Sequence, residues 1–286
     1  MAFVTIDGIE TRYEVRGSGE SLLMFSPGGF DATLEKWSSL GIYGKTKMLA
    51  PLLANYQCIL FDRRETGQSG GRVERITWQH YAAQGKGLLD HLGIDKAHLM
   101  GGCMGCAPVV AFAVAHPQAT RSMVLYWPVG GAKYRINGQQ RFSQHLAFVQ
   151  QQGLAAVLEL ARGSSKSFGE DPRAGPWVSV LRQTSLPAAA FAAAYVAQDV
   201  EHYALVVAGM SAALLDRDTA PGAEAEALLR LDTPALVVPG QDASHATSAA
   251  RYLHECLPAS AYWDIAPAAQ LETNVPARLL QFLAAH

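Results

Sequence analysis

Apolar residues in this chain gather in short, nearly continuous runs, separated by longer stretches with helical spacing. A continuous apolar run of this kind is typical of a strand that is buried on both faces of a sheet. The apolar positions of about Trp78–Leu92 recur with the period of a helix that stops at Gly93. Strands that alternate with helices predict an α/β fold with a mostly parallel central sheet and helices on both faces. The predicted buried strands are Leu22–Phe25, Cys58–Phe61, Ala97–Met100, Val124–Tyr126, Ala235–Val238 and Ala261–Ile265.

The beginning of the chain has a different pattern. Residues Phe3–Ile6 and Thr11–Val15 alternate between apolar and polar, as strands with one exposed face do. The pair Asp7-Gly8 between them is a turn signal. The pattern predicts an antiparallel hairpin ahead of the parallel strands.

Between Gly130 and about Arg230 the strand pattern stops, and only helical spacing remains. An insertion of this kind is expected to form a cap over the strand ends, where ligands bind in open α/β sheets. We therefore expect a core made of residues 1–130 and 231–286, with a helical cap formed by residues 131–230. The predicted cap helices lie near residues 138–152, 153–162, 176–183 and 187–214.

The candidate nucleophile is Cys103, in the stretch Gly101-Gly102-Cys103-Met104-Gly105. This stretch follows the strand that ends at Met100 and precedes a small apolar run that continues to Ala115. A strand, a sharp turn flanked by glycines and a helix form the setting of a G-x-S-x-G nucleophile elbow, here with Cys in place of Ser. The positive end of the helix dipole favours a thiolate over a thiol.

Three further motifs each follow another of the predicted strands. They are Ser26-Pro27-Gly28-Gly29, the run from Asp62 to Gly67-Gln68-Ser69, and Val237-Val238-Pro239-Gly240-Gln241-Asp242. With the elbow, they resemble the α/β-hydrolase superfamily, in its branch with a cap domain, over nearly the whole chain. The order and the spacing of the motifs match that fold as well as their letters do.

The resemblance implies an oxyanion hole made by the backbone N–H groups of Gly29 (or Phe30) and Met104. It also implies that Asp242 is the catalytic acid. Position 65 carries Glu where the family usually has Gly, so the turn is expected to be bulkier here.

One position departs from the family pattern in a way that affects the chemistry. The family places its catalytic His just after the last strand, where this chain has Gln270. A glutamine cannot accept and return a proton near neutral pH. His245 lies three residues beyond Asp242, in the loop that leaves the catalytic end of the sheet, and it is the candidate replacement base. His145 and His202 lie in the predicted cap, where histidines are more often ordinary surface or core residues.

A cysteine tolerates the loss of the usual His better than a serine does. A thiol with a pKa of about 8.5 is only ~3% ionised at pH 7, but a pKa of about 7 makes it half thiolate. The leading hypothesis is a cofactor-free enzyme in which Cys103 attacks a small, mostly apolar carbonyl substrate, with Asp242 and His245 as acid and base. Ester or thioester hydrolysis and acyl transfer fit best, and C–C bond cleavage fits the same residues.

Two other classes of function stay open at this point. Gln270 motivates the first, a ligand-binding or receptor protein whose triad has decayed. The second is a lyase, isomerase or decarboxylase that works without an acyl-enzyme and uses Gln270 to orient its substrate.

Several side chains are candidates for the substrate pocket. Phe30, Trp127 and Tyr134 are expected near the mouth of the cleft, and Gln270 at its wall. Arg63 and Arg64 follow the strand that ends at Phe61, where a structural role in the turn is the simpler interpretation. The other interpretation is that one of these arginines meets a substrate carboxylate.

Composition narrows the range of partners. With 49% hydrophobic and 17% charged residues and a net charge of −2, the chain has no basic surface suited to nucleic acid or to a membrane. The first residues lack a basic-then-apolar leader pattern, so a cytoplasmic protein with a small-molecule substrate is expected. The sequence leaves the oligomeric state open, with a homodimer as one candidate.

The four cysteines do not form a disulfide or zinc pattern. Cys103 and Cys106 spell C-x-x-C, but the surrounding motifs favour a packing role for Cys106 over that of a resolving thiol. The glycine-rich strings lack the Lys-Ser/Thr of a phosphate-binding loop. No metal and no cofactor are expected.

Overall fold

The computed structural model describes residues 1–286 and contains one eight-stranded sheet in the order β1-β2-β4-β3-β5-β6-β7-β8. Strand β1 pairs with β2 and β2 with β4 in antiparallel fashion, and every later pair is parallel. This is the α/β-hydrolase fold that the apolar runs and motifs predict. The strands are β1 (Ala2–Ile6), β2 (Ile9–Arg16), β3 (Ser21–Phe25), β4 (Gln57–Phe61), β5 (Ala97–Gly102), β6 (Thr120–Tyr126), β7 (Ala235–Val238) and β8 (Ser260–Tyr262).

The central strands alternate between two buried faces. Leu23, Phe25 and Leu99 pack into a core of 52 buried residues that also includes side chains of α4, α5 and the cap. Their neighbours Met24 and Met100 pack into a second core of 20 buried residues, with side chains of α2, α3 and α12. Burial on both faces explains why these strands are apolar throughout. The core helices are α1 (Lys36–Ser39), α2 (Gly41–Thr46), α3 (Leu49–Asn55), α4 (Trp78–His91), α5 (Cys106–Ala115), α10 (Ala225–Leu228), α11 (Thr247–Cys256) and α12 (Val275–Ala284).

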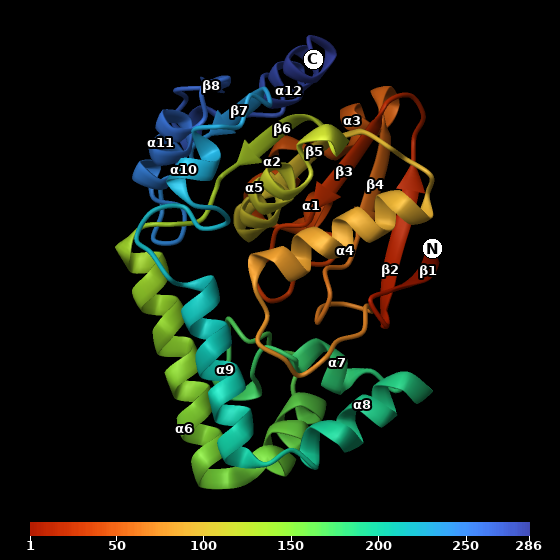
Figure 1. The fold of residues 1–286 in the computed structure, drawn as a ribbon, viewed down its shortest axis with the longest axis vertical. Helices are drawn as coiled ribbons and strands as arrows, with labels where there is room; N and C mark the ends of the chain where they lie inside the picture. Colours follow the sequence, from red (N-terminus) through yellow and green to blue (C-terminus); the bar gives the residue numbers. More distant parts are fainter.

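Between β6 and α10 the chain leaves the sheet and forms a helical layer, seen below the sheet in Figure 1. Its helices are α6 (Ala132–Gly163), α7 (Val178–Arg182), α8 (Leu186–Val196) and α9 (Val200–Leu214). The long α6 bends at Gly153, whose φ of 76° is not helical. We call the layer formed by α6 to α9 the cap.

The predicted boundary between the helices near 138–152 and 153–162 is confirmed, because Gly153, inside α6, has a non-helical φ of 76° and ψ of 173°. The element boundaries differ from the sequence predictions at two other places. The predicted helix 187–214 is two helices, because Asp199 accepts the backbone N–H of His202 and begins α9 as its N-cap. The last strand stops at Tyr262 and does not reach Ile265.

The cap is attached to the loop that follows β4. The indole Nε1 of Trp177 donates to the carbonyl of Arg72 at 2.9 Å. The amide Nε2 of Gln183 donates to the carbonyls of Gly67 and Ser69, both at 3.0 Å. These bonds fix the position of α7 relative to the ends of the parallel strands.

None of the helices has the length and apolar character that a membrane span requires. No group of three or more His, Cys, Asp or Glu side chains is arranged to hold a metal ion.

The elbow after β5 needs its glycines. A Cβ on Gly101 would lie 2.5 Å from the carbonyl oxygen of Gly105, and a Cβ on Gly105 would overlap the carbonyl of Phe25. We therefore expect Gly105→Ala to lower the free energy of unfolding by about 1–3 kcal/mol, the usual range for overpacking. The matched control is Gly163→Ala, where nothing lies within 4 Å of the new Cβ. Urea unfolding monitored by circular dichroism measures both, and equal midpoints would contradict the steric account.

Candidate active site

Cys103 occupies the turn between β5 and α5, with a φ of 55°. This left-handed conformation is uncommon for a residue other than glycine, and it lifts the side chain out of the line of the strand. The residue is partly exposed, whereas the elbow residues on both sides of it are buried. The strained turn therefore presents the sulfur at the ends of the parallel strands, on the side of the cap.

Tyr43 of α2 packs against the elbow. Its hydroxyl donates to the carbonyl of Tyr126 at 3.2 Å, and a Cβ on Gly102 would lie 2.8 Å from its ring. Only a glycine at position 102 leaves room for this ring. The sequence gives no signal for Tyr43, because it lies far from the elbow along the chain.

Asp242 and His245 lie on one turn after β7. The carboxylate oxygen Oδ1 of Asp242 accepts the backbone N–H groups of Ser244 and His245, at 2.8 and 3.0 Å. The imidazole Nδ1 of His245 lies 2.8 Å and 2.9 Å from the two oxygens of the same carboxylate. The turn thus holds the ring by a side-chain contact and by the backbone, and Nδ1–H is the donor to the acid.

The backbone around this turn fits closely against the end of β6. Gly130 donates its N–H to the carbonyl of Ser244 at 3.0 Å. The ring of Trp127 packs against His245 with centroids 5.5 Å apart. A Cβ on Gly240 would lie 2.5 Å from the Cβ of His245 and 3.1 Å from the ring of Trp127. The imidazole therefore has little freedom to turn away.

The second imidazole nitrogen, Nε2, is buried and has no hydrogen-bond partner of full geometry. Burial alone would lower the pKa of His245, but the negative charges of Cys103 and Asp242 raise it to about 9. Since Asp242 takes Nδ1, Nε2 is the nitrogen that is left for Cys103.

The thiol has the complementary shift. Burial alone would raise the pKa of Cys103, but the nearby charge of His245 outweighs this effect and lowers the pKa below its usual value. Two backbone N–H groups, from Gly28 and Met104, add to this effect. The arrangement favours a thiolate paired with an imidazolium.

The backbone donors near the sulfur come from two separate segments. Met104 follows Cys103, and Gly28 lies in the loop after β3, one residue before the donor Gly29 that the family resemblance implies. Gly28 and Gly29 both have positive φ, 118° and 61°. Two N–H groups that converge on one sulfur are suited to hold an oxyanion that forms beside it.

Gln270 is fully buried, and all its polar atoms have partners inside the protein. Its Oε1 accepts the hydroxyl of Tyr126 at 2.6 Å and the indole N–H of Trp127 at 2.8 Å. Its Nε2 donates to the carbonyls of Pro239 and Ile265, at 2.9 and 3.3 Å. Gln270 therefore links Trp127, which follows β6, to the loop that carries Asp242. No polar atom of the Gln270 side chain is left to bind a substrate.

Aromatic side chains of the core and of the cap meet in the hydrophobic cluster against which Cys103 packs. Phe30, in the loop after β3, packs edge-on against Phe142 and Phe168 of the cap, with centroids 5.5 and 5.2 Å apart. Tyr134, in the first turn of α6, is partly buried, and burial together with the charge of Cys103 raises its pKa. The surroundings of the sulfur are therefore mostly apolar.

The side chains of the remaining candidates, Cys106, His145 and His202, make contacts elsewhere in the protein or are exposed. The thiol of Cys106 donates to the carbonyls of Gly101 and Tyr126, at 3.2 and 3.6 Å, and burial raises its pKa well above the usual value. His145 is fully buried inside the cap, where its Nε2 lies 2.7 Å from the hydroxyl of Tyr203. Burial lowers the pKa of His145 to about 4. His202 is exposed on α9.

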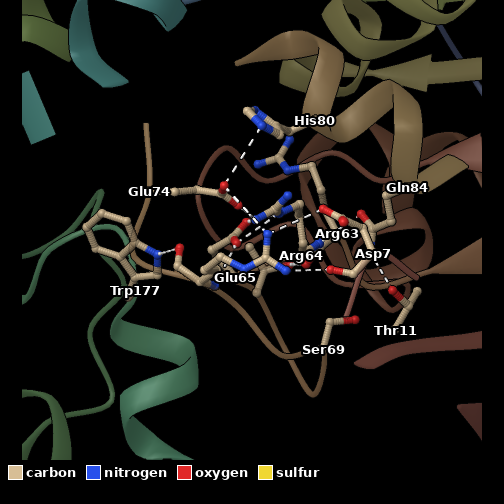
Figure 2. A network of polar contacts seen from close by, with 12 residues as sticks. Asp7, Thr11, Arg63, Arg64, Glu65, Ser69, Glu74, His80, Gln84 and Trp177 are labelled. Atoms are coloured by element: carbon tan, nitrogen blue, oxygen red, sulfur yellow. Dashed lines mark hydrogen bonds and ion pairs between the residues drawn. The ribbon is translucent and has the colours of Figure 1, made fainter. Parts of the chain in front are cut away.

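The loop after β4 carries a polar network that joins the core to the edge of the cap (Figure 2). The Nε of Arg64 donates to Glu65 at 2.9 Å, and its Nη2 donates to Glu74. Glu65 is fully enclosed, and burial raises its pKa to about 7 in spite of Arg64. Its φ of 67° shows why the family has glycine at this position.

The contacts of Gln270 give a testable consequence. Gln270→Leu leaves the hydroxyl of Tyr126 and the indole N–H of Trp127 buried without an acceptor, so we expect a loss of at least about 2 kcal/mol in the free energy of unfolding. Urea unfolding measures the change. The matched control is Gln151→Leu, on the exposed side of α6, which should stay within about 0.5 kcal/mol of the unaltered protein. A Gln270→Leu protein as stable as the control would mean that these bonds contribute nothing net.

Part of the chain is similar to a known protein family and to curated proteins. The model of a family described as "alpha/beta hydrolase fold" matches residues 22–131. The dihydrolipoyllysine-residue acetyltransferase component of the acetoin cleaving system of Cupriavidus necator is 32% identical over 128 residues, which is 45% of this chain and 32% of that protein. The 2-hydroxy-6-oxo-6-phenylhexa-2,4-dienoate hydrolase of Burkholderia cepacia is 34% identical over 116 residues, which is 40% of this chain and 38% of that protein. The chain thus aligns with less than half the length of these curated relatives.

Solved structures match over the whole chain. An enol-lactonase from Burkholderia xenovorans superposes with a TM-score of 0.62 at 19% identity, covering 99% of this chain and 100% of that one. A thermophilic esterase from Thermogutta terrifontis superposes with a TM-score of 0.61 at 19% identity, covering 99% and 98%. At such identities the likeness concerns the fold. The chain has the α/β-hydrolase fold, and the family model of that description matches part of its amino-terminal core.

Proposed function

We propose that this protein is a cofactor-free hydrolase or acyltransferase that uses Cys103 as its nucleophile. One observation carries the proposal. His245 is bound through Nδ1 to both oxygens of Asp242, and its buried Nε2 is left for a thiol whose pKa it lowers. Acyl transfer through a covalent intermediate requires a nucleophile, a base that activates it and an acid that orients the base, and Cys103, His245 and Asp242 would fill these roles.

The reaction would run in two halves. The Cys103 thiolate attacks the carbonyl carbon of the substrate, and the carbonyl oxygen takes the negative charge beside the N–H groups of the elbow and the β3 loop. As the tetrahedral intermediate collapses, the His245 imidazolium gives its proton from Nε2 to the leaving group, and an acyl thioester remains on Cys103. His245, now neutral, takes a proton from water or from an acceptor alcohol or thiol, which then attacks the thioester and frees the sulfur.

The surroundings of the site favour a small, mostly apolar acyl group. Phe30, Phe142 and Phe168 lie in edge contact across the boundary of core and cap. An activated ester or a thioester suits a sulfur nucleophile, since the leaving group is good and the attacking atom is soft. We propose ester or thioester hydrolysis as the reaction class, with acyl transfer as the alternative fate of the thioester.

A second candidate is hydrolytic cleavage of a C–C bond next to a ketone. The names of several curated relatives favour it, since they are hydrolases of 2-hydroxy-6-oxo acids, among them enzymes of Burkholderia cepacia and Comamonas testosteroni. Such a substrate offers a ketone carbon for the nucleophile to attack. Once its enol has ketonised, the neighbouring carbon can depart with the electron pair as a dienolate, which then takes a proton. Product analysis with a 6-oxo dienoic acid distinguishes this reaction from ester hydrolysis.

A ligand-binding protein with a decayed triad was suggested only by Gln270. The contacts of His245 weaken that suggestion, because they supply an acid and a base without the residue after the last strand. Turnover, and its loss in Cys103→Ala, discriminates between the two classes.

The activity test uses p-nitrophenyl butyrate and butyryl thiophenol ester as probes. We expect turnover, a mass increase of one butyryl group on the Cys103 peptide after rapid quenching, and complete loss of both in Cys103→Ala. Asp242→Asn should lower kcat by at least about a hundredfold, because the base loses the group that orients it. The matched control is Cys106→Ala, which should keep most of the activity. Absence of a Cys103 adduct with both probes would contradict the proposal.

The pKa shifts predict how the reactivity of Cys103 depends on pH. The thiolate should persist below the usual thiol pKa of about 8.5, so iodoacetamide should alkylate Cys103 rapidly near neutral pH. In His245→Ala the buried thiol loses its cation, so the alkylation profile should move to a pH above that of an ordinary thiol. Peptide mapping follows Cys103 separately, and Cys58, whose pKa burial raises to about 12, is an internal control that should stay unlabelled. Identical profiles in the two proteins would show that His245 does not act on the sulfur.

A further inference from the structure

Arg63 is a buried cation without a counter-charge. The side chain is 2% exposed, and its Nε and Nη1 have no hydrogen-bond partner. These two atoms carry three of the five N–H groups of a guanidinium. The other nitrogen, Nη2, donates to the carbonyl of Gly29 and lies 3.9 Å from the sulfur of Met104.

The other two buried arginines of the chain differ from Arg63 in this respect. Arg12 pairs with Asp62 at 3.2 Å and also with Glu35. Arg64 pairs with Glu65 at 2.9 Å and also with Glu74. No carboxylate of the protein lies within ion-pair distance of Arg63. Burying a charge without a partner costs several kcal/mol, and proteins normally avoid it.

The position of Arg63 connects it with the reaction site. Gly29 and Met104 belong to the two segments whose N–H groups converge beside Cys103. The guanidinium carbon lies 4.4 Å from the centre of the Tyr81 ring, which stabilises the cation on one side without neutralising it. Tyr134 of the cap lies close enough to both Cys103 and Arg63 for their charges to act on its hydroxyl. Through its contacts with Gly29 and Met104, Arg63 therefore touches both of the segments that lie beside Cys103.

We propose that Arg63 binds a carboxylate of the substrate, so that the protein acts on a carbonyl compound that also bears an acid group. Arginine presents N–H groups that match a carboxylate and stays charged at every physiological pH. The ligand would give the guanidinium the negative partner that the protein does not provide. The unpaired N–H groups are enclosed, so the carboxylate can reach them only when a covering side chain moves.

This inference rests on the proposed role of Cys103, and it identifies Arg63 rather than Arg64 as the arginine for the substrate. Arg64 has both of its partners within the β4 loop (Figure 2). Arg63 contributes a bond to the backbone of Gly29, so a purely structural role is the alternative that the experiment must separate.

The test compares two alkylating agents of nearly the same shape, iodoacetate and iodoacetamide, at Cys103. Both attack the same thiolate, so the ratio of their rates cancels the thiolate fraction and leaves the effect of the charge on the reagent. We expect the unaltered protein to favour iodoacetate relative to a free thiol such as glutathione. In Arg63→Gln the ratio should fall about ten- to a hundredfold, the effect expected of one charged hydrogen bond.

Two controls separate the contributions. Arg251→Gln removes one positive charge from the exposed face of α11 and should leave the ratio unchanged. His245→Gln removes the other cation near the sulfur and should keep most of the preference for iodoacetate. If Arg63→Gln does not fold, the His245→Gln protein still tests the proposal, because a ratio equal to that of glutathione would then overturn it.

A substrate pair extends the test beyond a small reagent. The p-nitrophenyl monoester of adipic acid carries a free carboxylate, and its methyl ester is a neutral match of similar length. We expect Arg63→Gln to raise KM for the acid about tenfold or more and to change the neutral ester little. Equal losses on both esters would mean that Arg63 only holds Gly29, and this would overturn the proposal while leaving the role of Cys103 intact. If neither reagent alkylates Cys103 in the unaltered protein, the proposed function itself is contradicted.

Discussion

The pairing of Cys103 with His245 is the interaction on which the site depends. Each residue is held in a position that would be unfavourable alone: burial disfavours a thiolate at the elbow and disfavours an imidazolium under Trp127. Together each supplies the charge that stabilises the other. The φ of Cys103 and the close approach of Gly240 to His245 place the two side chains in turns that follow β5 and β7, the strands on either side of β6.

Much of the fold can be predicted from the sequence, since the information is local. Strands buried on both faces are apolar throughout, and Gly101 and Gly105 mark the elbow because no larger residue fits there. The division between α8 and α9 was missed because the alanines around position 190 favour a continuous helix. Asp199 carries a capping signal that could have indicated the break.

Only part of the candidate site can be predicted from the sequence. Asp242 and His245 are three residues apart, so their proximity follows from the chain. The proximity of His245 to Cys103 depends on how β5, β6 and β7 lie next to one another, which no short motif encodes. The contacts of Gln270 come from β6, the acid loop and the segment after β8, so its place in the structure could not be inferred from the letter alone. Arg63 looks like its neighbour Arg64 in the sequence, and only their partners distinguish them.

The short turn that carries both Asp242 and His245 has a consequence for motion. In an arrangement where acid and base come from different loops, any loop movement changes the distance between them. Here the carboxylate is bonded to the backbone N–H groups of Ser244 and His245 as well as to the imidazole, so the pair moves as one body. Opening the cap, or shifting the chain after β8, can change the access to the sulfur while the proton-transfer pair stays assembled.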